Sequence, residues 1–220
     1  MKYILTLLLL SGLSLEASEE SRRPNVLFIA VDDLRCELGC YGVKEVKSPR
    51  IDEFAGSAVT FTRAYVQVAV CNPSRVAVMT GLRPDTTKVW DLPTRFRETT
   101  PDAVTIPQHF REHGYTAVSF GKIFHNPWPD NQSWDQPHEW PKDAGLWSEE
   151  AKQRHKEYRQ QMKTDGKPPA KINRMRAQAL EALDIPDSQH VDGGIADQAI
   201  SAMRELSQED KPFFLAAGFV

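Results

Sequence analysis

Two adjacent carboxylates follow an apolar run near the beginning of the chain. The run is Val26–Val31, and Asp32 and Asp33 come directly after it. Adjacent carboxylates repel each other, and an oxygen-preferring divalent cation is the usual means of stabilising such a pair where it is partly buried. A helix cap followed by a turn would use the same two residues, so both interpretations stand at this point.

A cysteine begins a short motif further along. The segment Cys71-Asn-Pro-Ser-Arg75 is followed by apolar residues and then by Thr80-Gly81. We expect a strand at residues 65–70 and a helix from Cys71 to Gly81, which places Cys71 at a strand-to-helix turn. The unpaired N–H groups at a helix N-terminus favour an anion there. The alternative is a buried thiol at the start of a helix.

Two further polar side chains follow the next predicted strand. Residues 115–120 are expected to be a strand, and Gly121-Lys122-Ile-Phe-His125 comes at its carboxyl end. This position is the carboxyl end of a strand, the edge of an α/β sheet at which ligands gather. Without the surrounding motifs, a solvated lysine and a loop histidine would be the better interpretation.

The remaining pattern supplies the framework for these residues. Helices are expected from Ser48-Pro49, at residues 106–114, at residues 148–166 and across the apolar positions Ile195, Ala199, Ala202, Met203 and Leu206; the first has Ile51, Phe54, Ala55 and Ala58 on one face. Residues 126–147, rich in Pro and Trp, indicate a long ordered loop, and residues 213–220 a final strand. Alternating strands and helices predict an α/β fold with a mostly parallel central sheet and helices on both faces.

With these residues in view, the sequence resembles the type I sulfatases of the alkaline phosphatase superfamily. Cys71-x-Pro-Ser-Arg75 with Thr80-Gly81 carries the resemblance, with Asp32-Asp33 before it and Gly121-Lys122 after it. Four segments are similar to the iduronate-2-sulfatase branch: Asp33-Leu-Arg, Leu38–Gly42, Arg83–Thr87 and Gly121–His125. The resemblance covers nearly all of the chain after residue 23, is weakest at residues 126–190, and implies an alkaline-phosphatase-like fold.

The resemblance also implies roles for the site residues. Cys71 would be oxidised to formylglycine by a formylglycine-generating enzyme, and Arg75 would hold the formylglycine hydrate. Lys122 and His125 would contact the sulfate or the leaving-group oxygen. Asp32, Asp33 and the modified Cys71 would bind calcium, although magnesium accepts similar oxygens.

A bare thiol would suit sulfate ester hydrolysis poorly, because its sulfated form has no simple release step. One hydroxyl of an aldehyde hydrate can attack sulfur and expel the alcohol, and the other can then expel sulfate by re-forming the aldehyde. The family completes the metal shell with an Asp-Asn or Asp-His pair, and adds a second Lys and a further His, all beyond Val220. We therefore expect residues 24–220 to be the N-terminal part of a sulfatase catalytic domain, inactive by themselves.

The beginning of the chain indicates export. Lys2, an apolar run and small residues up to Ala17 are typical of a secretory signal peptide at residues 1–17, so we expect a periplasmic or extracellular protein without stable membrane insertion. A net charge of -3 gives no reason to expect nucleic acid as a partner.

The chain has two cysteines besides Cys71. Cys36 and Cys40 are expected to be buried thiols rather than a disulfide.

Three functions remain open at this stage. The first is removal of sulfate from a sulfated polysaccharide of the glycosaminoglycan type, the second is phosphonate or phosphate monoester hydrolysis on the same fold, and the third is glycan binding without catalysis.

Four tryptophans could stack on sugar rings, but anchoring of the loop is their favoured role: Trp128, Trp134, Trp140 and Trp147. His109 and His113 are spaced for one helix face and are expected to be solvated.

Overall fold

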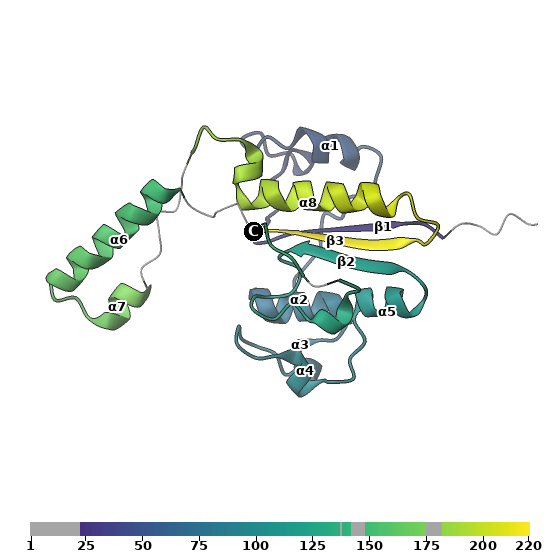
Figure 1. Cartoon of the computed structure of the whole chain (residues 1–220), viewed down its shortest axis with the longest axis horizontal. Helices are drawn as coiled ribbons and strands as arrows, with labels where there is room; N and C mark the ends of the chain where they lie inside the picture. Colours follow the sequence, from purple (N-terminus) through teal and green to yellow (C-terminus); the bar gives the residue numbers. More distant parts are fainter. Residues whose placement is uncertain (1–22, 137, 142–147, 175–181) are drawn as a thin grey trace, which may run out of the picture.

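The computed structural model describes residues 23–136, 138–141, 148–174 and 182–220. The predicted signal peptide, residues 1–17, and Trp147 lie outside these ranges. Figure 1 shows a sheet between two layers of helices, with α1 (Pro49–Ala55) and α8 (Val191–Leu206) on one face and α2 (Cys71–Thr80) and α5 (Ile106–Glu112) on the other. The predicted α/β layering is confirmed.

The described sheet has the strand order β1-β3-β2, with β1 at Val26–Val31, β2 at Thr116–Gly121 and β3 at Phe213–Phe219. Both pairs are parallel, and Phe214 of β3 lies opposite Val26 on one side and Ala117 on the other. Because the strands all run in one direction, their carboxyl ends meet at a single edge, where polar side chains from different strands can converge.

Strand β1 differs from its prediction in one respect. Its unbroken apolar run predicts a buried central strand, but β1 lies at the edge of the described sheet and β3 is the central strand. Leu27, Ile29 and Val31 are 41–57% exposed, whereas residues 213–218 of β3 are buried. The run correctly indicates a strand, but the strands that lie beside it are determined by segments far away in the sequence.

Helix α2 packs on the sheet through Val76 and Met79, which are almost fully buried. They belong to an apolar cluster with Phe96, Phe124, Trp134 and Phe214. The helix ends at Gly81, which adopts the left-handed conformation with φ 69° and donates its N–H to the carbonyl of Ala77. The predicted helix at these residues is confirmed.

Helix α8 covers the opposite face of the sheet. Ile195, Ala199 and Leu206 are buried, while Ala202 and Met203 are partly buried. A second apolar cluster joins this helix to β2 and β3 through Ala199, Leu206, Val118, Phe213, Leu215 and Ala217. The predicted helix and its apolar face are therefore confirmed.

Two predictions between β1 and α2 are wrong. Helix α1 forms, but Ile51 and Phe54 on its expected packing face are 47% and 70% exposed, and the helix ends before Ala58. The strand predicted at residues 65–70 is absent, and Tyr65 is 84% exposed. Its apolar pattern is that of a strand, but within the described residues it pairs with no other strand.

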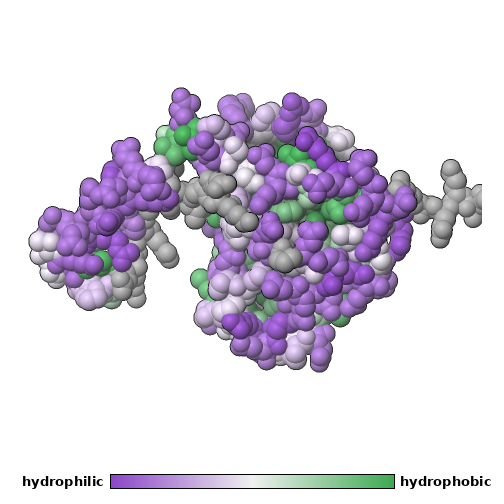
Figure 2. Space-filling model, in the orientation of Figure 1, coloured by the Kyte–Doolittle hydropathy of each residue, from purple (hydrophilic) through white to green (hydrophobic). Residues whose placement is uncertain are grey.

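The smaller elements lie in the connections. They are α3 (Pro84–Thr87), α4 (Phe96–Thr99), α6 (Glu149–Thr164), α7 (Pro169–Arg174) and the short 3-10 helices η1 (Gly39–Tyr41), η2 (Asn131–Ser133) and η3 (Asp187–Gln189). Helix α6, capped by the side chain of Ser148, projects with α7 from the body and has a mostly hydrophilic surface, as Figure 2 shows and as its sequence predicts. Within the described residues, every helix is too short or too polar to span a bilayer.

Candidate active site

The first candidate ligands lie at the carboxyl end of β1. The backbone N–H of Asp32 donates to the carbonyl of Phe219 over 3.1 Å, so the ladder continues one residue beyond the strand. Asp33 then turns the chain with a φ of 52° and lies exposed at the surface, whereas the Asp32 side chain is only 13% exposed. The two carboxylates therefore have different surroundings although they are adjacent in sequence.

Cys71 is the first residue of α2. Val70 before it is extended, with φ -140° and ψ 135°, and Pro73 fits the first turn because an N–H there has no partner within the helix. The Cys71 sulfur lies 3.6 Å from Oδ1 of Asp32 and 3.9 Å from Nζ of Lys122. The structure thus brings together three residues that the sequence analysis assigned to one site.

Arg75 links the carboxyl ends of the two outer strands. Its Nη2 donates to Oδ1 of Asp32 over 2.6 Å, and its Nη1 donates to the carbonyls of Lys122 and Ile123. The side chain is 11% exposed. Arg75 therefore holds Asp32, while its expected contact with a modified Cys71 stays a prediction.

Lys122 follows a close approach between β2 and β3. Gly121 has a φ of 68°, and a Cβ at this position would lie 2.2 Å from the carbonyl oxygen of Gly218. The backbone N–H of Lys122 donates to that carbonyl over 2.7 Å, and Nζ pairs with Oδ2 of Asp32. The Lys122 side chain is 14% exposed and forms a charged cluster with Asp32, Cys71 and Arg75, which rules out a solvated surface lysine.

Asp32 therefore has a cation on each carboxylate oxygen. Burial alone would raise the pKa of Asp32, but the hydrogen bonds and charges of Lys122 and Arg75 outweigh burial and hold the pKa below its usual range. The carboxylate is ionised at neutral pH, and it keeps the two positive side chains beside Cys71.

His125 is half-buried near these cations. Burial lowers the pKa of its imidazole, and the charges of Lys122 and Arg75 lower it further, against a smaller opposing effect of Asp32. Its Nδ1 is buried and has no hydrogen-bond partner within the described part of the chain. The imidazole is therefore largely neutral at neutral pH.

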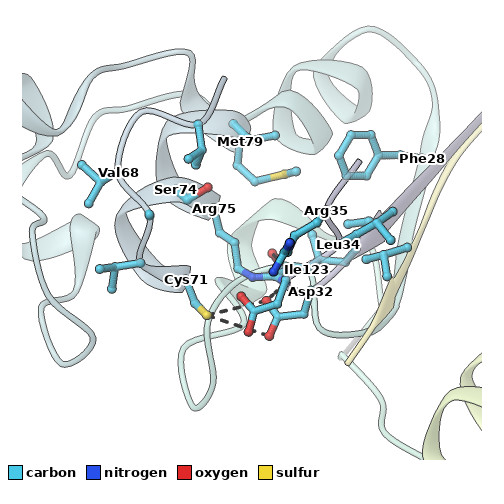
Figure 3. A pocket seen from close by; sticks show the side chains of 17 residues that line it. Phe28, Asp32, Leu34, Arg35, Val68, Cys71, Ser74, Arg75, Met79 and Ile123 are labelled. Atoms are coloured by element: carbon cyan, nitrogen blue, oxygen red, sulfur yellow. Dashed lines mark hydrogen bonds and ion pairs between the residues drawn. The ribbon is translucent and has the colours of Figure 1, made fainter. Parts of the chain in front are cut away.

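A cavity of about 600 Å³ opens beside this cluster. Figure 3 shows the sulfur of Cys71 directed at the carboxylate of Asp32, with Arg75 extending from its helix to the same carboxylate. Apolar side chains such as Phe28, Met79 and Ile123 line the rest of the cavity. The charged groups therefore stand at one side of a largely apolar space.

The donor atoms fit part of a cation site. One ligand atom from each of Asp32, Asp33 and Cys71 lies within 4.8 Å of the others. Two carboxylates suit calcium or magnesium, which prefer oxygen; a thiol does not, but an aldehyde hydrate in its place would supply a further oxygen. Calcium takes about six to eight oxygens, so these residues form one side of a shell.

Asn72 has a structural role that the sequence pattern does not reveal. Its side chain is buried, and its amide donates to the backbone carbonyls of Asp91, Leu92 and Thr94 over 2.8–3.2 Å. These bonds fix the loop before α4 to the first turn of α2. Asn72 occupies the variable position of the motif, and nothing in the sequence shows which distant carbonyls it reaches.

The aromatic and thiol predictions have mixed outcomes. Trp134 is buried and donates to the carbonyl of Pro129, so it anchors its loop as predicted. All three cysteines of the chain are free, but Cys36 is exposed and Cys40 is only partly buried, which contradicts the expected burial. His109 is exposed, and its ring lies 4.1 Å from that of His113.

The fold and the cluster together define an α/β protein with a charged candidate site at the carboxyl edge of a parallel sheet. Residues 24–220 match the family described as Sulfatase. The chain belongs to the sulfatase family, within the alkaline phosphatase superfamily. The fold and family expected from the sequence are thus confirmed.

Two curated relatives indicate which branch of the family this chain is similar to. Iduronate 2-sulfatase of Homo sapiens is 37% identical over 208 residues, which are 94% of this chain and 36% of that protein. Iduronate 2-sulfatase of Mus musculus is 40% identical over 195 residues, or 89% and 34% of the two chains. The chain spans about a third of the length of these relatives.

Solved structures agree on the fold. A 2-O GAG sulfatase superposes with a TM-score of 0.57 and 26% identity, covering 89% of this chain and 34% of that one. The phosphonate monoester hydrolase of Agrobacterium radiobacter gives a TM-score of 0.60 with 20% identity, covering 90% and 41%. At this identity the second likeness shows the fold alone.

Proposed function

We propose that residues 24–220 are the N-terminal part of the catalytic domain of a sulfuric ester hydrolase, with formylglycine made from Cys71 as the nucleophile. The observation that carries the proposal is the position of Cys71 at the first turn of α2, 3.6 Å from Asp32 and 3.9 Å from Lys122. Unpaired N–H groups, Lys122 and Arg75 together supply the positive charge that a sulfate ester needs there.

Each residue of the cluster has a role in this proposal. The formylglycine hydrate supplies the attacking hydroxyl, and calcium held by Asp32, Asp33 and the modified Cys71 would stabilise negative charge when bound. Asp32 positions Arg75 and Lys122, and Lys122 contacts the sulfate oxygens. The neutral His125 donates a hydrogen bond to the oxygen of the departing alcohol, which stabilises the charge that develops there.

The proposed substrate is a 2-O-sulfated uronic acid, or a similar sugar, of a sulfated polysaccharide. The similarity to iduronate 2-sulfatases over 89–94% of the chain supports this choice. We also propose export to the periplasm or the exterior after cleavage of residues 1–17, and maturation by a formylglycine-generating enzyme. N-terminal sequencing of the protein from its own host should then begin near Ser18.

Hydrolysis assays separate this function from its alternatives. The complete protein from its own host, which on this proposal also carries the ligands expected beyond Val220, should release sulfate from a 2-O-sulfated uronic acid disaccharide faster than it cleaves an aryl phosphonate monoester. Cys71→Ala should abolish release, whereas Cys36→Ala, which changes an exposed thiol, should not. Faster cleavage of the phosphonate would favour the sister activity, and glycan binding without hydrolysis would favour a non-catalytic protein.

A further inference from the structure

A second cavity lies on the other flank of α2 from the Cys71 cavity. It has a volume of about 330 Å³ and is bounded by the first turns of α2 and α4 and by the loop after His125. Asn72, the neighbour of Cys71, lines it, as do Pro127 and Trp128, which follow His125. Two segments that carry site residues therefore continue directly into the wall of this cavity.

The cavity contains an arginine stacked on an indole. The guanidinium carbon of Arg95 lies 3.5 Å from the centre of the Trp128 ring. The stack occupies that face of the indole and fixes the guanidinium plane, so its edge N–H groups are presented together. In the described part of the chain, the acidic partner of Arg95 is Glu98, whose carboxylate oxygen is 3.8 Å away at the surface.

The other charges of the cavity wall cancel. Asp130 is 5% exposed and accepts two hydrogen bonds from Arg97, of 2.9 Å and 2.8 Å. The Arg97 guanidinium also binds the side chain of Gln108. This pair holds the loop that carries Trp128 and leaves Arg95, whose side chain is 50% exposed, as the positive charge that faces solvent.

One polar atom of the cavity wall also has no partner. Nε1 of Trp128 is buried and makes no hydrogen bond within the described residues. Buried N–H donors are satisfied in most proteins, so an acceptor bound by the guanidinium of Arg95 that also reached this N–H would satisfy it. A sulfate or a carboxylate is the acceptor that matches the planar fork of an arginine.

We propose that Arg95 and Trp128 form a subsite for an anionic group, sulfate or carboxylate, on the sugar next to the one that carries the scissile ester. This proposal rests on the proposed function, because the ester must occupy the neighbouring Cys71 site. Asn72 joins the two sites by holding the loop before Arg95 against the first turn of α2. The subsite thus favours a polysaccharide with charges on consecutive sugars over one with an isolated sulfate.

Substrate pairs test the subsite directly. Three disaccharides would share one 2-O-sulfated uronic acid and differ in the next sugar, which is neutral, sulfated or carboxylated. For protein from its own host we expect a KM about tenfold lower for a charged neighbour than for the neutral one, the usual scale of a charge-assisted bond. The charged disaccharide with the larger gain identifies the natural anion.

Variants assign the preference to these residues. Arg95→Gln should remove the preference while leaving KM for the neutral disaccharide unchanged, and Arg95→Lys should keep part of it. Trp128→Leu should weaken the preference, because the guanidinium loses its support. Arg50→Gln, which removes the same charge from a side chain that is 90% exposed on α1, should leave the preference intact.

An unchanged preference in Arg95→Gln, with a thermal midpoint like that of the parent, would overturn the subsite. If the parent protein releases sulfate from none of the disaccharides, the proposed function fails instead. Equilibrium binding of the same sugars then decides the subsite: a charge preference that Arg95→Gln removes supports it, and equal affinities overturn it.

Discussion

Asp32 connects every charged group of the candidate site. It accepts from Arg75 and Lys122 and lies next to the Cys71 sulfur, so one carboxylate positions two cations and a nucleophile. Its side chain is 13% exposed, and ionic hydrogen bonds of this kind are stronger than those at a surface. The neighbouring Asp33 is exposed, so its carboxylate can bind a cation without contributing to the stability of the fold.

This contrast predicts different effects for two matched substitutions. Asp32→Asn should lower the free energy of unfolding by about 2 kcal/mol, because Arg75 and Lys122 would face each other without a counter-charge. Asp33→Asn should change it by less than about 0.5 kcal/mol. Urea unfolding measures both, and equal costs for the two variants would contradict the positioning role of Asp32.

Both substitutions should lower the rate of sulfate release. Each removes a proposed calcium ligand, and a loss of about a hundredfold is typical when a group that stabilises charge in a transition state is removed. The comparison therefore separates stability, which only Asp32 supports, from catalysis, which both residues support. Full activity in Asp33→Asn would contradict the proposed metal site.

At the scale of elements, the site depends on how closely β2 and β3 approach at their carboxyl ends. Gly121 and Gly218 lie opposite each other, and the N–H of Lys122 reaches the carbonyl of Gly218. A Cβ on Gly121 would collide with the carbonyl oxygen of Gly218, and a Cβ on Gly218 would collide with the backbone of Lys122 directly after β2. This approach turns the chain after β2 so that Lys122 points towards Asp32.

Gly121→Ala should therefore be far more damaging than an alanine at a glycine in open space. Its Cβ would lie 2.2 Å from a backbone oxygen, so we expect a loss of about 3 kcal/mol or more in unfolding free energy. Gly166→Ala is the matched control, because its φ is also 68° but nothing lies within 4 Å. That variant should cost only about 1 kcal/mol, and similar losses in both would refute the packing argument.

The loop after β2 makes stability depend on pH. His138 accepts or donates a hydrogen bond with Ser119 over 3.2 Å, and burial lowers the pKa of its imidazole. The unfolded chain binds a proton at this residue near its ordinary pKa of 6.5 and the folded chain does so only at lower pH. Its contribution is therefore complete above pH 6.5 and is lost as the pH falls below that value.

His138→Gln removes this titration. The unfolding free energy of the parent should decrease more than that of the variant when the pH is lowered from about 7.5 to about 5.5. Urea denaturation at the two pH values measures the difference. Parallel decreases in the two proteins would show that His138 is protonated equally in the folded and unfolded states.

Elements with strong local signals were predictable from the sequence. Helix α8 has apolar residues at helical spacing, and α2 has a proline in its first turn and a glycine at its end, so local physics specifies both. The strand expected at residues 65–70 had the right composition but no partner in the described sheet. The edge position of β1 could not be predicted either, because strand order depends on contacts between segments far apart in sequence.

The site was predictable in its residue types but not in its contacts. Asp32 follows the end of a predicted strand and Cys71 begins a specific motif, whereas Arg75 and Lys122 were assigned to the site by the resemblance to sulfatases. The pairing of both cations with Asp32, the carbonyl bonds of Asn72 and the stacking of Arg95 on Trp128 depend on side-chain geometry across distant loops. No single segment of sequence contains that information.

At the scale of the whole molecule, three chain segments meet at one edge of the sheet and create the site. The end of β1 supplies Asp32, the start of α2 supplies Cys71 and Arg75, and the end of β2 supplies Lys122. These segments are separated by 39 to 90 residues in the sequence. The site therefore exists only when the sheet has formed, so its chemistry requires a correctly folded chain.

The most direct test of the central claim is the mass of the peptide that contains Cys71, taken without alkylation from protein made in its own host. Conversion of cysteine to formylglycine lowers the residue mass by about 18 Da, whereas ordinary thiol oxidation adds mass. The proposed mechanism predicts this loss at Cys71 and an unchanged mass at Cys36 and Cys40. Unmodified Cys71 in all of the protein would contradict a formylglycine nucleophile.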